Sequence, residues 1–169
     1  MFEVSQFLSD VEVDHILSLA KNMQRSTVVG DSHTMDETRT STNTWIGRSS
    51  SPIIDSIYRR TADLTGIDES LMRFQEDEYG NEYESIAESL QLVHYEEGQE
   101  YTPHHDFHYP KSTDKFQSAR FATILLYLND GMDGGETAFP RAVNSKAHDG
   151  LQVKPEKGKV RNEGGVKFL

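Results

Sequence analysis

A histidine and an aspartate two positions apart, His104 and Asp106, have the types and spacing to share a metal ion. They end residues 95–107, which read YEEGQEYTPHHDF. If this segment is a strand, alternate side chains share a face, so these two point together while His105 points away. An imidazole and a carboxylate are two of the three ligands of the 2-His-1-carboxylate triad, which leaves open positions on iron(II). The spacing therefore predicts part of a metal site, and the alternative is a polar strand end whose aspartate caps the next turn.

Short strands must position this pair, and the second half of the chain contains several candidates. Turn residues separate the predicted strands, which cover residues 90–95, 101–107, 120–128, 136–139 and 151–153. Short strands at this spacing favour a barrel or a double-sheet jelly roll.

Two amphipathic helices are predicted in the first half. Ser9 and Glu12 form a capping box, and apolar residues then recur at helical spacing to residue 23. Ser51 can cap a second helix that has Pro52 at its first position and Gly66 as its end. Residues 26–29 and 39–46 are rich in Ser, Thr and Val and are predicted to be strands. The fold class expected is therefore mainly β with supporting helices (α+β).

Composition restricts the kind of protein. A chain of 169 residues corresponds to one domain, 1–169, with its own core. The sequence has no cysteine, which excludes disulfides and thiolate metal ligands and leaves His, Asp and Glu to bind a metal. It has no apolar run of membrane-spanning length and no secretory signal at its start.

Acidic residues dominate the charge, which is −11 overall. Between residues 68 and 100, eleven acidic residues accompany one basic residue, Arg73. Nucleic acid is therefore excluded as a partner, because phosphate binding needs a basic surface. A basic peptide partner and a solvated acidic loop both fit this charge. Residues 68–87 are interpreted as an acidic insertion rather than a second domain.

Several blocks of sequence together resemble one family, the prolyl 4-hydroxylases. Residues 95–107 are similar to that family's first metal-binding strand. Residues 120–130 (RFATILLYLND) and 134–140 (GGETAFP) are similar to its core strand and its Gly-Gly-Glu-Thr-x-Phe-Pro turn. N-terminal blocks at residues 7–9, 26–28 and 39–41 agree. The resemblance runs in order to residue 158, apart from the acidic insertion.

The resemblance implies a double-stranded β-helix, or jelly roll, that hydroxylates proline in a peptide or protein. The implied cofactors are Fe(2+), 2-oxoglutarate as co-substrate, and L-ascorbate as reductant. His104 and Asp106 would be metal ligands, Tyr95 and Thr137 would contact 2-oxoglutarate, and Tyr101 would belong to the peptide groove. Core packing of the two tyrosines and a turn hydroxyl for Thr137 are the alternatives. The family also suggests the endoplasmic reticulum as location.

The family pattern stops after residue 159. An apolar strand, a second histidine and a basic residue for 2-oxoglutarate are expected there, but residues 160–169 read VRNEGGVKFL. We therefore expect an atypical tail over 160–169, a jelly roll truncated at its C-terminus, and impaired turnover. His108 and His148 are the other histidines considered as a third ligand.

Two further functions fit the residues. The first is a non-catalytic remnant that acts as a peptide-binding module. The second is a metal hydrolase built on residues 104–106. Succinate formation from 2-oxoglutarate would distinguish the dioxygenase from both.

Overall fold

The structure, a computed structural model, describes residues 2–26, 38–73, 75–76, 82–83, 85–106, 120, 122–142 and 150–163. The helices are α1 (Asp10–Ser18), α2 (Pro52–Thr65) and the short 3-10 turns η1 (Arg48–Ser50) and η2 (Glu69–Met72). The strands are β1 (Phe2–Val4), β2 (Gln24–Arg25), β3 (Thr42–Ile46), β4 (Gln75–Glu76), β5 (Glu82–Tyr83), β6 (Leu90–His94), β7 (Thr123–Leu126), β8 (Thr137–Phe139), β9 (Leu151–Val153) and β10 (Val160–Glu163). The expected class, mainly β with helices, is confirmed.

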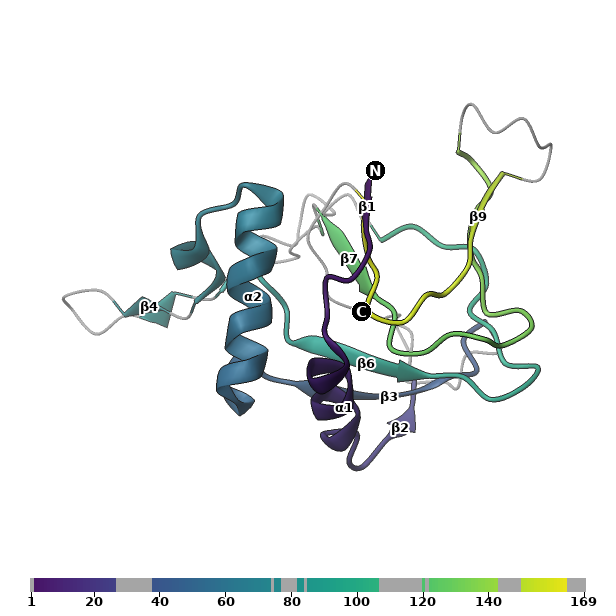
Figure 1. The fold of residues 1–169 in the computed structure, drawn as a ribbon, viewed down its shortest axis with the longest axis horizontal. Coiled ribbons are helices and arrows are strands. Elements are labelled where there is room, and N and C mark those ends of the chain that lie inside the picture. The colour runs from purple at the N-terminus through teal and green to yellow at the C-terminus, as the bar shows by residue number, and fades with distance from the viewer. Residues whose placement is uncertain are drawn as a thin grey trace, which may run out of the picture.

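The strands form two small antiparallel sheets and two hairpins (Figure 1). One sheet has the order β1-β10-β7, and the other has the order β2-β3-β6. The hairpins are β4-β5 and β8-β9. Each three-stranded sheet joins strands from distant parts of the chain. The sheet β1-β10-β7 pairs the first and last described strands with a strand from the second half of the chain.

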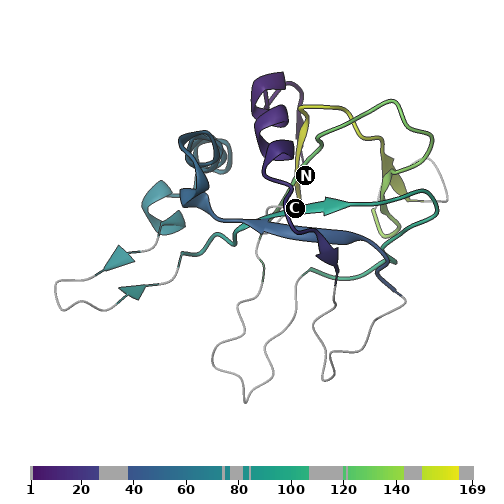
Figure 2. The same cartoon turned by 90° about the horizontal axis from the view of Figure 1, so that it is seen from below.

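Both long helices lie on the same side of β3 and β6 (Figure 2). Leu90 and Leu92 alternate along β6, and both are buried in a cluster that includes Ile54 and Ile57 of α2. The apolar side chains that alternate on β6 therefore pack against the apolar face of α2 in one core. Among the described helices, none combines the length and the apolar character needed to cross a membrane.

The predicted helix starts are confirmed. Ser9 and Glu12 form the capping box of α1, and the Ser51 hydroxyl accepts a hydrogen bond from the backbone of Ile54. Gly66 ends α2 in a left-handed conformation with φ 68°. However, α1 ends at Ser18 rather than at residue 23, because the next backbone N–H groups bond three residues back.

Most predicted strands are present, but the one expected at 101–107 is not. Over residues 102–106 no strand forms, and Tyr101 makes only an isolated bridge with Arg39. Pro103 has no N–H to donate, which disfavours a paired strand there. Strand β7 is shorter than the predicted 120–128, and β2 precedes the predicted 26–29, of which residues 27–29 lie outside the described residues. The predicted 39–46 strand is shortened to β3.

The expectation that no strand follows residue 159 is wrong. Strand β10 pairs with β1 on one side and with β7 on the other, and Val160 is fully buried. Backbone pairing on both sides supplies the hydrogen bonds, so the strand forms without an alternating apolar pattern. Residues 164–169 of the expected tail lie outside the described residues. The acidic segment 68–87 contains η2 and the β4-β5 hairpin.

Candidate metal-binding site

The structure brings His104 and Asp106 together although they are not on a strand. The Nε2 atom of His104 lies 3.4 Å from Oδ1 of Asp106. With metal bonds of about 2.1 Å, two adjacent ligands of one ion lie about 3 Å apart, so this separation suits a shared metal. Both side chains are partly exposed, which leaves the pair accessible to an ion.

The imidazole of His104 is held in the tautomer that a metal ligand needs. Its Nδ1 lies 2.9 Å from the carbonyl oxygen of Thr102. A carbonyl only accepts hydrogen bonds, so Nδ1 carries the proton and Nε2 presents its lone pair toward Asp106. A backbone carbonyl on the far ring nitrogen is the usual support of a metal-binding histidine.

The carboxylate of Asp106 is oriented by β7. Its Oδ2 accepts a hydrogen bond of 2.7 Å from the hydroxyl of Thr123, a residue that is only 6% exposed. Nη1 of Arg120 lies 3.8 Å from Oδ1, the oxygen that faces His104. Neither Thr123 nor Arg120 was selected from the sequence. Both residues lie in the block 120–130, which resembles the family's core strand, but that resemblance does not reveal that they contact Asp106.

Aromatic and basic side chains back the histidine. The ring of Tyr101 stacks on His104 with 3.7 Å between ring centroids and 19° between ring planes. The guanidinium carbon of Arg39 lies over the ring of Tyr101, 4.8 Å from the ring centroid. Burial raises the pKa of the Tyr101 phenol, while the charge of Arg39 opposes that shift. Tyr101 therefore contacts both Arg39 and the candidate metal ligand.

The remaining predicted site residues are not bonded to the pair. Tyr95 is 43% exposed at the end of β6, and the hydroxyl of Thr137 on β8 accepts a hydrogen bond of 2.9 Å from Tyr127. In the part of the chain that the structure describes, no hydrogen bond joins Tyr95 or Thr137 to His104 or Asp106. Their assignment to 2-oxoglutarate stays a prediction.

A third ligand is not found among the described residues, in which no group of three His, Asp or Glu side chains could hold a metal. His105 is exposed. His94 pairs with Glu96, and His15 bonds to the Ser51 hydroxyl. The alternative ligands His108 and His148, together with His33, lie outside the described residues.

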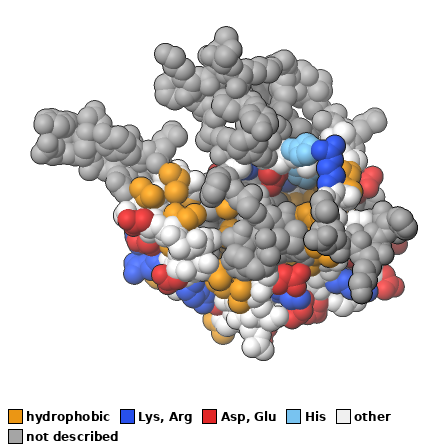
Figure 3. Space-filling model, turned by 90° about the horizontal axis from the view of Figure 1, so that it is seen from above, with side chains coloured by type: hydrophobic (Ala, Val, Ile, Leu, Met, Phe, Trp, Pro, Cys, Tyr) orange, Lys and Arg blue, Asp and Glu red, His pale blue; other side chains and the backbone are white. Residues whose placement is uncertain are grey.

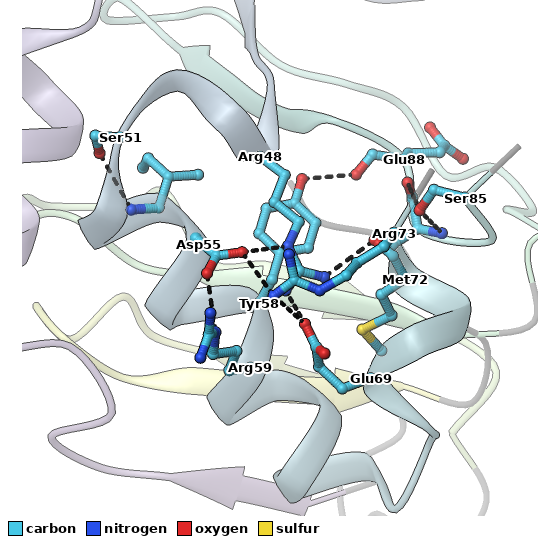
Figure 4. Close-up of polar contacts among 12 residues, drawn as sticks. Arg48, Ser51, Asp55, Tyr58, Arg59, Glu69, Met72, Arg73, Ser85 and Glu88 are labelled. Atoms are coloured by element: carbon cyan, nitrogen blue, oxygen red, sulfur yellow. Dashed lines mark hydrogen bonds and ion pairs between the residues drawn. The ribbon is translucent and has the colours of Figure 1, made fainter. Parts of the chain in front are cut away.

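A second cluster of charged side chains joins α2 to η1 and η2 (Figure 4). Arg48 is its centre, with Nε donating to Asp55 at 2.6 Å, Nη1 donating to the carbonyl of Met72 at 3.1 Å, and Nη2 paired with Glu69. Arg73 pairs with Glu69 at 2.7 Å. The hydrogen bond from Arg48 lowers the pKa of the Asp55 carboxyl. The charges in this cluster therefore neutralise one another.

This cluster lines a hollow of about 690 Å³. Tyr58 and Glu88 line the hollow, and the Tyr58 hydroxyl donates to the Glu88 carbonyl at 2.8 Å. The Glu88 carboxylate accepts from Nε of Arg120 at 2.6 Å, and Arg120 reaches Asp106. Polar contacts therefore continue from α2 to the candidate metal site.

The face seen in Figure 3 shows histidine side chains at the surface beside basic and acidic ones. The side chains of His104 and Asp106 are 36% and 25% exposed.

The chain is similar to several known proteins. Residues 90–161 match the family model described as the 2OG-Fe(II) oxygenase superfamily. Over 174 residues the chain is 37% identical to probable prolyl 4-hydroxylase 3 of Arabidopsis thaliana, covering 93% of this chain and 55% of that protein. It is 36% identical over 176 residues to prolyl 4-hydroxylase 2 of the same plant, covering 93% and 54%. The chain spans about half the length of these curated relatives.

Two solved structures share the fold. One is a viral collagen prolyl hydroxylase from Paramecium Bursaria Chlorella virus-1 in complex with 2OG (TM-score 0.64, 21% identity, 98% of this chain and 77% of that chain). The other is a prolyl-4-hydroxylase from Pseudomonas putida (TM-score 0.66, 17% identity, 98% and 81%). The sequence matches make the chain similar to prolyl 4-hydroxylases and, over residues 90–161, to the 2OG-Fe(II) oxygenase superfamily, and the two solved structures show that the fold is shared.

Proposed function

We propose that the protein is an iron(II)- and 2-oxoglutarate-dependent dioxygenase that hydroxylates proline in a peptide or protein. The observation that carries the proposal is the His104–Asp106 pair, whose outer atoms are held by the Thr102 carbonyl and the Thr123 hydroxyl. The match to the 2OG-Fe(II) oxygenase superfamily over residues 90–161 supports the choice of metal and co-substrate.

Each group in the pair has a defined part in this function. Nε2 of His104 and Oδ1 of Asp106 would bind the iron, because the other ring nitrogen and the other oxygen are already hydrogen-bonded. Bound iron(II) would supply dioxygen activation coupled to decarboxylation of 2-oxoglutarate, with one oxygen atom entering succinate and the other entering proline. The chain itself would orient the reactants and hold the carboxylate and imidazole in place.

The other cofactor contacts belong to the same proposal. Tyr95 and Thr137 would contact 2-oxoglutarate, and Tyr101 would line the path of the peptide. L-ascorbate would act as the reductant that keeps the iron in its ferrous state. The names of the plant relatives support a proline-containing substrate.

Anaerobic metal titration by calorimetry tests the site. We expect His104→Ala and Asp106→Ala each to reduce Fe(II) affinity by about 100-fold or more, since each removes a ligand rather than its support. His105→Ala is the matched control, because it removes an imidazole from the same segment that is exposed and not part of the pair. Equal losses for all three variants would show that the pair is not the metal site.

Product analysis tests the reaction. Incubation with Fe(II), 2-oxoglutarate, ascorbate, oxygen and a proline-rich peptide should yield succinate and a peptide heavier by one oxygen atom on proline, at the low rate expected from the impaired turnover that the sequence predicts. Peptide binding without succinate would instead support the alternative, a peptide-binding module. Oxygen-independent hydrolysis would support the metal hydrolase.

A further inference from the structure

Tyr101 lies between a buried cation and the candidate metal ligand. Arg39 covers its ring at 4.8 Å, and the His104 imidazole stacks on it at 3.7 Å. The resemblance gave Tyr101 a place in the peptide groove and gave Arg39 no role. The stack gives both residues a contact that does not involve a peptide.

We propose that Tyr101, backed by Arg39, is a positioning residue for the His104 imidazole. This inference rests on the proposed metal site. It goes beyond that site because it gives Tyr101 a role in orienting the metal ligand His104, in addition to its expected place in the peptide groove.

The imidazole needs a second constraint in addition to its hydrogen bond. The bond from Nδ1 to the Thr102 carbonyl fixes one edge of the ring but allows the ring plane to tilt about that bond. The nearly parallel stack, with 19° between planes, restricts that tilt. Together the two contacts direct Nε2 of His104 toward Asp106, where the metal would bind.

Arg39 fixes the tyrosine from the opposite segment. Its side chain is only 6% exposed, and its Nε donates to the Ser41 hydroxyl at 3.4 Å. The backbones of Arg39 and Tyr101 form an antiparallel bridge, and Thr102 N–H donates to the Thr38 carbonyl at 2.9 Å. A guanidinium over an aromatic ring is attracted to the face of that ring. Residues 38–39 therefore hold both the ring of Tyr101 and the backbone of Thr102, whose carbonyl oxygen bonds to Nδ1 of His104.

Metal titration without peptide separates positioning from substrate binding. We expect Tyr101→Leu and Arg39→Met each to reduce Co(II) or Fe(II) affinity by about 10-fold, which is the usual effect of losing a ligand's support. Tyr101→Phe keeps the ring and should stay within about 3-fold of the unmodified chain. Trp45→Leu is a matched control, because it removes a half-exposed aromatic ring from β3. Thermal melts confirm that each variant is folded.

A metal-free measurement makes the inference independent of the proposed function. In the unmodified chain, proton NMR should show His104 ring protons shifted upfield by the Tyr101 ring current. That shift should disappear in Tyr101→Leu and persist in Tyr101→Phe.

The outcomes separate as follows. Unchanged metal affinity in Tyr101→Leu, with an effect only on the peptide KM, would overturn the inference and leave the proposed function standing. Equal losses in Tyr101→Phe and Tyr101→Leu would also overturn it, since the hydroxyl would then be the essential group. If the unmodified chain binds no metal, the proposed function fails, and the presence or absence of the His104 shift still decides whether the stack holds the ring.

Discussion

Gly158 provides a sharp test of how the C-terminal strand is attached to the rest of the fold. It precedes β10, is buried, and has φ +78°. A Cβ atom added there would lie 2.6 Å from the carbonyl oxygen of Leu8, whereas ordinary contact begins near 3.4 Å. Gly158→Ala must therefore push the two backbones apart.

That separation has a calculable cost. The Gly158 carbonyl accepts from Leu8 N–H at 3.0 Å, and its own N–H donates to the Tyr127 carbonyl at 2.9 Å. Weakening both hydrogen bonds costs about 1 kcal/mol each. The positive φ adds about 1–2 kcal/mol for any residue with a Cβ atom. We expect Gly158→Ala to lower the free energy of unfolding by about 3–4 kcal/mol in total.

Gly98 is the matched control. It has the same φ of +78°, and a Cβ atom added there would meet nothing within 4 Å. Gly98→Ala should therefore cost only the conformational part, about 1–2 kcal/mol. The two variants differ by about 2 kcal/mol, which corresponds to about 4–8 °C in Tm for a chain of this length.

Melting followed by circular dichroism, or by calorimetry, measures the difference between the two alanine variants. A Gly158→Ala variant that melts together with Gly98→Ala would refute the close approach of residue 158 to the N-terminal segment.

Two further predictions follow from hydrogen bonds to carboxylates. Thr123→Val keeps the shape of the side chain but removes the donor to Asp106, so Fe(II) affinity should fall by about 10-fold or more in calorimetric titration, while Thr123→Ser should restore it; equal affinity in both variants would contradict this. Asp55 has a lowered pKa because Arg48 bonds to it, so its ionised form stabilises the fold above its unfolded pKa of about 3.9, and this stabilisation is lost as pH falls through the lower folded value. Urea unfolding should therefore show the stability gap between the unmodified chain and Asp55→Asn shrinking from pH 7 to pH 3, and a constant gap would argue against the pairing.

The sequence by itself determined the elements whose signals are local. Ser51, Pro52 and Gly66 set the start and end of α2, because capping, a fixed φ and a left-handed end each act within one helical turn. Short runs separated by turn residues likewise predicted β6, β8 and β9. The spacing of His104 and Asp106, together with the resemblance of several blocks in order to one family, was enough to select them as a candidate pair.

Only the tertiary structure decided which distant segments complete the site and the sheets. It placed Thr123 on Asp106 and Arg39 on Tyr101, contacts that no spacing along the chain encodes. It also showed His104 and Asp106 meeting outside any strand, so the predicted proximity of the two side chains holds although the local structure predicted for them was wrong. Strand β10 was missed for the same physical reason. Its stability comes from backbone hydrogen bonds to two partner strands, and those bonds leave little trace in its own side-chain pattern.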